Sequence, residues 1–188
     1  MSAPPQLPGV VTRAHALSRR RGFVSSCRNE TGWLLATLAA TRTGTLAESG
    51  TGCGVGSAWL RSGMRDEARL VTAEHDAGLV EAVREMFAGD DAVSVFEADW
   101  KELAHEAPFS LLFLDVREAK RAGPDVAAAL VEPGGLVVLD DFTPCATWPP
   151  MYQGRVDVTR QQWLTDPRFT TVEVMVAVDA SVLIATRR

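Results

Sequence analysis

The chain has 188 residues, of which 46% are apolar and 23% are charged, an ordinary composition for a globular protein. The net charge of −5 is unevenly distributed, because residues 1–42 contain six arginines and one glutamate. The N-terminal segment is therefore basic, and the rest of the chain is acidic. The acidic body excludes a dedicated nucleic-acid-binding protein, and the lack of any run of about 18 apolar residues excludes a membrane-spanning helix.

The length predicts a single domain over residues 1–188. Residues 1–9 are rich in proline and are expected to be disordered, and residues 10–42 are expected to form an N-terminal helical region. The three cysteines are odd in number and far apart, which indicates free thiols in a reducing compartment. Since the N-terminus also lacks a signal pattern, we expect a cytoplasmic location.

Two helices are expected in the N-terminal region. The first covers residues 10–21, and the second runs from residue 30 or 31 to residue 41 with an apolar stripe along one side. The basic run Arg19–Arg21 is either a solvated helix face or an arm that docks an acidic partner.

From Thr45 onward, strand-like and helical segments alternate along the chain. The first expected strand begins at Thr45, and the next four cover residues 69–74, 92–96, 110–115 and 136–139. The expected helices cover residues 55–61, 77–87, 100–105 and 124–131. This alternation predicts a parallel sheet covered on both faces, with ligands bound at the carboxyl ends of the strands. All five strands end in an acidic residue, so we expect this edge of the sheet to be functional.

The C-terminal part departs from this alternation. Residues 142–159 are rich in proline and aromatic residues and have no periodicity, which predicts a long lid or binding loop. A short helix over residues 160–164 follows, and two β-branched runs over residues 169–178 and 181–186 predict a terminal hairpin.

A glycine-rich stretch, Glu48-x-Gly50-x-Gly52-x-Gly54, joins the first expected strand to a helix. Glycine lacks a Cβ atom, so the backbone can turn sharply and approach a ligand, and the N–H groups of the helix end then face that ligand. The dinucleotide-binding pattern G-x-G-x-x-G fails from either starting glycine. The stretch is therefore a cofactor loop of another kind or a simple tight turn.

Glu74 ends the next expected strand, where a carboxylate can accept hydrogen bonds from both vicinal hydroxyls of a ribose. A solvated acid at a strand end is the alternative. The stretch from Glu48 to Gly54 resembles motif I of the class I S-adenosylmethionine-dependent methyltransferases. It has an acid followed by alternate glycines between a strand and a helix, and a second acid, Glu74, ends the next strand. The resemblance runs from Thr31 to Arg188 and implies an α/β, Rossmann-like, doubly wound seven-stranded sheet, mostly parallel, with an antiparallel strand from the C-terminal hairpin.

The resemblance also implies S-adenosyl-L-methionine as the cofactor. The residues that it assigns to cofactor binding are Glu48, Gly50, Gly52, Gly54, Glu74, Asp99 and Trp100. Ala98-Asp99 is similar to a Gly-Asp pair whose acid meets the adenine amino group in the family, with Trp100 placed to pack on the ring. Alanine stands here where glycine is usual.

Within the family, the acids after strands four and five are similar to those of the catechol and caffeoyl-coenzyme A type O-methyltransferases. That type binds Mg²⁺ through such acids, which here are Asp115, Asp140 and Asp141. Three converging carboxylates repel one another unless a cation or proton bridges them, and hard oxygen ligands suit Mg²⁺. The family's lysine, three residues after the strand-four acid, is replaced by Glu118, and Lys120 lies two positions later.

Three residues are the candidates for catalysis. Asp115 or Asp141 would act as a carboxylate base, and Lys120 would assist proton transfer. Trp148 and Tyr152 either wall the acceptor or pack the loop down. We expect a methyltransferase acting on a small-molecule acceptor, at oxygen.

Two other functions remain open from the sequence. One is a non-catalytic cofactor-binding module that docks a partner through its basic N-terminal arm, and the other is an NAD(P)-dependent oxidoreductase. The expected partner is a small-molecule acceptor, and we expect neither a nucleic acid nor a membrane as a partner. The sequence also allows a homodimer.

Overall fold

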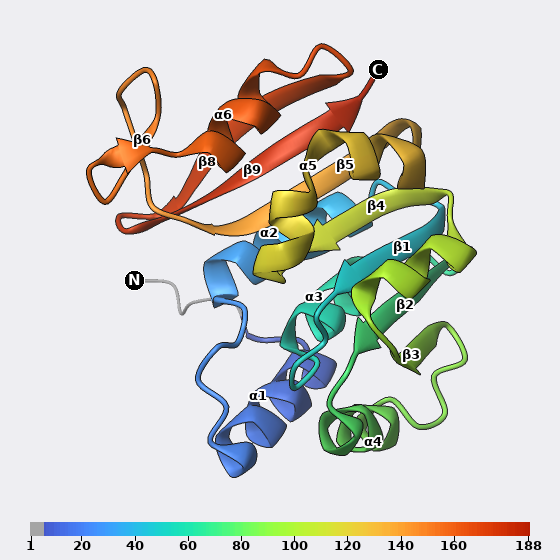
Figure 1. The fold of residues 1–188 in the computed structure, drawn as a ribbon. Coiled ribbons are helices and arrows are strands. Elements are labelled where there is room, and N and C mark those ends of the chain that lie inside the picture. Colours follow the sequence, from blue (N-terminus) through green and yellow to red (C-terminus); the bar gives the residue numbers. More distant parts are fainter. Residues whose placement is uncertain (1–5) are drawn as a thin grey trace.

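The computed structural model describes residues 6–188, so most of the segment expected to be disordered lies outside the described residues. Seven strands form one sheet in the order β3-β2-β1-β4-β5-β9-β8 (Figure 1). These strands are β1 (Gly44–Ser49), β2 (Ala68–Glu74), β3 (Val93–Glu97), β4 (Phe109–Leu114), β5 (Val131–Phe142), β8 (Phe169–Ala177) and β9 (Ala180–Arg187). The helices are α1 (Gly9–Arg21), α2 (Asn29–Ala39), α3 (Val55–Gly63), α4 (Ala77–Met86), the 3₁₀ helix η1 (Trp100–Glu106), α5 (Arg117–Leu130) and α6 (Val158–Thr165).

Strands β1 to β5 run parallel to one another, and β9 pairs antiparallel with both β5 and β8. Parallel neighbours need a crossover helix, whereas β8 and β9 follow one another in the chain and are joined by a tight turn, which makes them antiparallel. The predicted doubly wound, seven-stranded, mostly parallel sheet is therefore confirmed.

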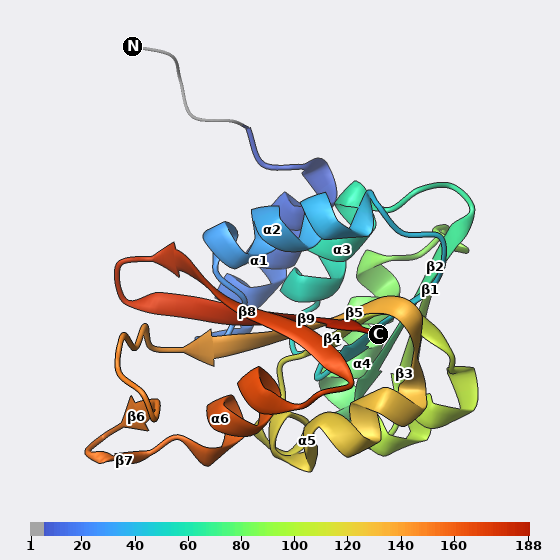
Figure 2. The ribbon, with the colours of Figure 1, turned by 90° about the horizontal axis from the view of Figure 1, so that it is seen from above.

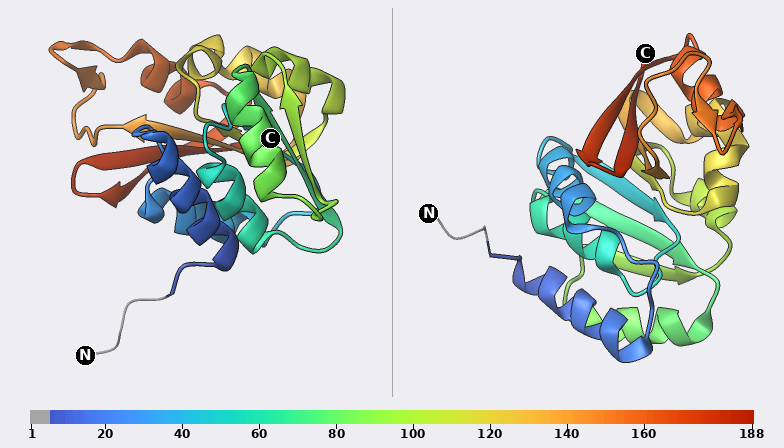
Figure 3. Two further views of the ribbon diagram at one scale, coloured as in Figure 1. Left: turned by 90° about the horizontal axis from the view of Figure 1, so that it is seen from below. Right: turned by 90° about the vertical axis from the view of Figure 1, so that its left-hand side faces the viewer.

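The sheet separates two apolar cores. Along β1, Leu46 faces the core that α1 to α4 cover, and Ala47 faces the core that η1, α5 and α6 cover. Figure 2 shows α1, α2 and α3 on one side of the sheet and α5 and α6 on the other, and Figure 3 shows the same layers from two further sides. Both faces are buried along β1, β2 and β4, so the ligand-binding edge is left at the carboxyl ends of the strands.

Several predicted boundaries were wrong. Helix α5 begins at Arg117, seven residues before the predicted start, because non-helical backbone at Gly123 joins a first helical segment to one that starts at Pro124. Strand β5 extends from Val131 through the predicted turn to Phe142.

The segment 142–159 is also more regular than its composition predicts. It contains a small hairpin of β6 (Met151–Tyr152) and β7 (Arg155–Val156), and α6 begins at Val158. Within residues 6–188, no helix has both the length and the apolar content needed to cross a lipid bilayer.

Candidate cofactor and acceptor site

The glycine loop between β1 and α3 has a backbone that only glycine adopts easily. Gly50, Gly52 and Gly54 have φ angles of 88°, 53° and 74°, in the left-handed region. A Cβ atom on Gly50 would lie 2.4 Å from Cγ2 of Val116, so the loop passes too close to the β4–α5 turn for any side chain. The N–H groups of the first turn of α3 have no partner within the helix, as at any helix start, and no side chain caps them.

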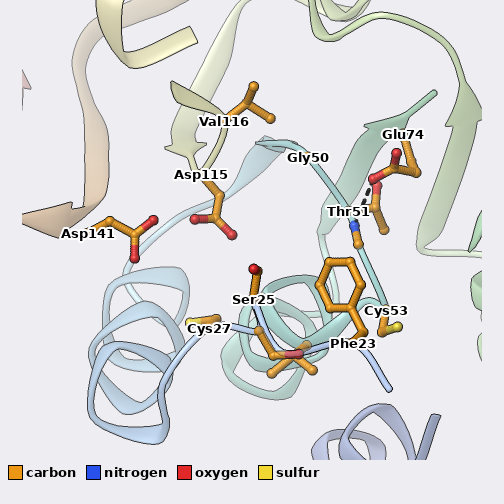
Figure 4. A pocket seen from close by; sticks show the side chains of 14 residues that line it. Phe23, Ser25, Cys27, Gly50, Thr51, Cys53, Glu74, Asp115, Val116 and Asp141 are labelled. Carbon is orange, nitrogen blue, oxygen red and sulfur yellow. Dashed lines mark hydrogen bonds between the residues drawn. The ribbon is translucent and has the colours of Figure 1, made fainter. Parts of the chain in front are cut away.

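A cavity of about 200 Å³ lies beside this loop. Its lining consists of Phe23, Ser25, Ser26, Cys27, Gly50, Thr51, Gly52, Cys53, Val55, Gly56, Glu74, Asp115, Val116 and Asp141. Figure 4 shows the loop on one side, the segment before α2 on another, and the two aspartates from the ends of β4 and β5 across from Glu74. The first turn of α3 thus opens onto a cavity with acidic groups at two ends.

Glu74 is fixed in this cavity by backbone amides. Its Oε2 accepts a hydrogen bond of 3.0 Å from the Gly52 N–H (Figure 4), and its Oε1 accepts bonds of 2.9 and 3.0 Å from the His75 and Asp76 N–H groups. The His75 ring Nδ1 also lies 3.2 Å from Oε1, whereas Oε2 accepts one of these hydrogen bonds, so a free acceptor site for a ligand remains on Oε2. The side chain is buried except for its surface in the cavity, which suits it to accept a bond from a ligand hydroxyl.

The segment between α1 and α2 supplies a wall that sequence reasoning missed. Phe23 lies across Gly52, whose added Cβ would approach its ring to 3.0 Å. Arg28 holds the far end of the segment through two hydrogen bonds, of 2.9 and 3.1 Å, to the Asp179 carboxylate in the β8–β9 turn. The available signal was one aromatic residue in a polar stretch between two helices.

Glu48 does not line the cavity, and its expected contact with the cofactor stays a prediction. It is fully buried beneath the loop, where it accepts hydrogen bonds from the hydroxyls of Ser57 and Thr72. Burial raises the pKa of Glu48 to about 8, because no solvent stabilises its charged form. A Cβ on Gly56 would overlap the Glu48 carboxylate, so this acid braces α3 against the sheet.

Asp99 and Trp100 also lie outside the lining of this cavity. Asp99 is exposed and caps η1, accepting a hydrogen bond of 3.0 Å from the Lys101 N–H. Trp100 is half-buried against the core under η1 and α5. Their roles at an adenine ring stay predictions.

The three aspartates expected to bind a metal do converge. Asp115, Asp140 and Asp141 each offer a carboxylate oxygen, and these atoms all lie within 4.8 Å of one another. Burial, and then the neighbouring charge of Asp141, raise the pKa of Asp115 to about 7. Burial likewise raises the pKa of Asp140, which accepts a hydrogen bond of 3.2 Å from the Thr31 hydroxyl.

Lys120 reaches this cluster from the first turns of α5. Its Nζ donates hydrogen bonds of 3.1 Å to the Asp140 carbonyl and 3.2 Å to Asp141 Oδ2. The side chain is largely buried. Although it stands two positions after Glu118, Lys120 therefore brings its ammonium to the acids.

A second and larger cavity, of about 1020 Å³, opens on the other side of the acids. Its lining consists of Asp115, Arg117, Lys120, Arg121, Asp140, Asp141, Phe142, Thr143, Tyr152, Gln153, Arg155, Val156, Asp157, Val158, Thr159 and Arg160. Tyr152 belongs to this wall, whereas Trp148 does not and is 64% exposed. Asp115 and Asp141 line both cavities, so the acids form a shared wall between them.

Comparisons with known proteins identify similar structures. No family model and no curated protein matches the sequence. The O-methyltransferase TomG from Streptomyces achromogenes, solved in complex with SAM, is 21% identical, with a TM-score of 0.76 over 97% of this chain and 92% of that one. A putative O-methyltransferase from Klebsiella pneumoniae is 22% identical, with a TM-score of 0.74 over 97% and 92%. A putative caffeoyl-CoA O-methyltransferase from Staphylococcus aureus is 16% identical, with a TM-score of 0.69 over 95% and 92%.

The chain has the class I methyltransferase fold. In this methyltransferase fold the glycine loop, Glu74 and the three aspartates all lie at the carboxyl ends of parallel strands, where open α/β sheets bind ligands. The similarity concerns the fold. Which ligands this chain binds depends on the residues that line its two cavities.

Proposed function

We propose that the protein transfers a methyl group from S-adenosyl-L-methionine to a hydroxyl oxygen of a small-molecule acceptor. The observation that carries the proposal is the pair of cavities that share Asp115 and Asp141. One cavity has the features of a cofactor site, and the other is large enough for a separate acceptor. A group transferred between the two ligands passes the shared aspartates.

The smaller cavity has groups that suit the methionine carboxylate and the ribose of the cofactor. The uncapped first turn of α3 attracts a carboxylate, such as that of a methionine group, through its free N–H groups. The remaining acceptor capacity of Glu74 suits a ribose hydroxyl. When bound, the sulfonium group supplies an electrophilic methyl group.

The larger cavity would hold the acceptor against the carboxylates. Asp115 has a raised pKa of about 7, a value suited to receiving a proton from an acceptor hydroxyl at neutral pH. Beyond this proton transfer, the protein's contribution is alignment, because two ligands held in place react as one unit. Lys120 positions Asp141 through its hydrogen bond of 3.2 Å.

The donor set also fits Mg²⁺. Asp115, Asp140 and Asp141 present three oxygen ligands within 4.8 Å of one another, and hard carboxylate oxygens are what Mg²⁺ prefers. These three residues would hold the ion, which would supply positive charge to an acceptor oxygen. The proposal of methyl transfer does not depend on this ion.

Calorimetry with S-adenosylhomocysteine tests the proposal. We expect the full-length protein to bind this compound at micromolar concentration, and Glu74→Ala to weaken binding about tenfold, because the acceptor for a ligand hydroxyl is lost. Glu81→Ala, which removes an exposed carboxylate from α4, is the matched control and should leave binding unchanged. No heat from the unmodified protein at millimolar ligand would overturn the proposal.

Two further observations bear on the alternatives. Lys120 reaches the acids despite the glutamate at the family's lysine position, which favours a catalytic protein over a cofactor-binding module without activity. Cys27, Cys53 and Cys145 are free thiols, which supports a reducing compartment such as the cytoplasm.

A further inference from the structure

The arginines without partners gather in two places. Among residues 6–188, six arginine side chains make no hydrogen bond or ion pair: Arg13, Arg19, Arg20, Arg117, Arg121 and Arg155. The first three belong to α1, and the other three line the larger cavity. In a chain of net charge −5, half of the unpartnered guanidinium groups thus surround one cavity.

The three arginines of the cavity come from two walls. Arg117 and Arg121 are four residues apart on α5, so their side chains lie on the same face of that helix. Arg155 belongs to β7, in the small hairpin that forms another part of the lining. All three are exposed, whereas Asp140 is buried at the base of the same cavity. The cavity therefore combines carboxylates at the strand ends with guanidinium groups at its exposed margin.

The other two cations of the lining are already occupied. Lys120 donates to Asp141 and to the Asp140 carbonyl. Arg160 is fully buried, donates a hydrogen bond of 2.7 Å to the Thr143 carbonyl, and lies 3.3 Å from carboxylate oxygens of both Asp157 and Glu173. These contacts hold the loop in place and leave no charge for a ligand. The charge available to a ligand is that of the three exposed arginines.

We infer that the acceptor carries an anionic group, a carboxylate or a phosphate, which Arg117, Arg121 and Arg155 bind while its hydroxyl faces the aspartates. A guanidinium group presents paired N–H donors that match the oxygens of either anion. A neutral acceptor gains nothing from the three guanidinium groups of the lining, whereas an anion is attracted and oriented by them. This inference rests on the proposed function for the hydroxyl end, and on the arginines alone for the anionic end.

Binding of simple anions to the full-length protein tests the inference. Benzoate and phenyl phosphate are the probes, and neutral benzamide, of similar shape, is their reference. We expect at least one anion to bind about tenfold more tightly than benzamide. The anion that binds better identifies the anionic group of the acceptor as a carboxylate or a phosphate. Equal binding of all three compounds would overturn the inference.

A matched pair of variants locates the effect. Arg117→Gln, Arg121→Gln and Arg155→Gln combined should weaken anion binding about tenfold or more, and Arg13→Gln, Arg19→Gln and Arg20→Gln combined should leave it unchanged although the same net charge is removed. Equal effects in both variants would indicate general attraction and reject the site. Arg155→Gln alone, on the exposed hairpin, repeats the test with a single surface change and should weaken anion binding in the same direction.

Cofactor binding separates this inference from the proposed function. The variant that combines Arg117→Gln, Arg121→Gln and Arg155→Gln should bind S-adenosylhomocysteine as the unmodified protein does. That result would also show that the variant is folded. Failure of S-adenosylhomocysteine to bind any of the proteins would remove the proposed function, and the anion measurements would still decide the arginine site.

Discussion

Lys120 Nζ lies 3.2 Å from Asp141 Oδ2 and 3.1 Å from the Asp140 carbonyl oxygen. This contact places one positive charge against a group of three carboxylates that otherwise repel one another. It also joins the start of α5 to the end of β5, the two elements on either side of the larger cavity. The lysine is thus part of both the electrostatics and the framework of the site.

Loss of this cation should destabilise the protein. We expect Lys120→Met to lower the free energy of unfolding at pH 7 by about 1–2 kcal/mol, a value reduced for the exposure of Asp141. The loss should shrink at pH 5, where Asp115, with its pKa of about 7, is protonated and the repulsion falls. Urea denaturation at both pH values measures it. Lys101→Met, which removes an exposed lysine, is the control, and equal losses in the two variants would contradict a specific role.

Binding of a divalent cation should depend on Asp140. We expect Mg²⁺ to bind the full-length protein, and Asp140→Asn to weaken that binding about tenfold, because one of three carboxylate ligands loses its charge. Calorimetry measures the affinity, with the exposed Asp91→Asn as control. Removal of divalent ions by a chelator should lower methyl transfer, and full activity in the chelated protein would count against a role for the ion.

The buried carboxyl of Glu48 should make stability depend on pH. In the unfolded chain it ionises near its ordinary pKa of 4.5, whereas in the folded protein it keeps its proton up to about pH 8. The folded state therefore binds the extra proton, and stability falls as pH rises through this window, by up to about 1.4 kcal/mol per unit, and levels off above it.

Glu48→Gln removes this dependence, because an amide does not ionise. Relative to the unmodified protein, the variant should gain stability steadily between pH 5 and about pH 8. Urea denaturation across this range gives the difference at each pH. The exposed Glu81→Gln should run parallel to the unmodified protein, and a constant offset for Glu48→Gln would mean that the group is charged in the folded state.

Phe23 should contribute to cofactor binding from outside the sheet. Its ring covers Gly52 on one side of the smaller cavity, and Phe23→Ala should weaken S-adenosylhomocysteine binding about tenfold through lost apolar contact. The neighbouring Val24→Ala changes a residue that is 95% exposed and should have no effect. Calorimetry compares the three proteins, and equal affinities would show that the segment only borders the cavity.

The sheet and its functional edge could be predicted because each buried strand is a short apolar run that ends in an acid. Glu74, Asp115 and Asp141 lie at the ends of the second, fourth and fifth of these runs, and parallel strands bring their carboxyl ends to one edge. The convergence of the aspartates follows from this topology alone. Lys120 could be proposed from the family resemblance, because it lies two positions after Glu118, which occupies the place of the family's lysine.

The remaining features depend on contacts between distant segments. Whether Glu48 faces the ligand or the interior depends on the packing of α3, which strand alternation does not specify, because its neighbours on both sides are buried. The position of Phe23 over Gly52 depends on how the α1–α2 segment lies against the glycine loop, a tertiary contact with no local pattern. The helical segment before Gly123 was not predicted, because its residues are mostly charged and show no apolar periodicity.

The wall of Asp115 and Asp141 between the two cavities implies that the two ligands are thermodynamically linked. A cationic ligand in the smaller cavity changes the electric field in the larger one. The protein therefore binds the acceptor with one affinity when the smaller cavity is empty and with another when it is filled. By reciprocity, the acceptor alters the affinity for the cofactor by the same factor. We therefore expect the Kd of each ligand to change when the other is bound, by the same factor in both directions, and replacement of these aspartates to reduce that factor.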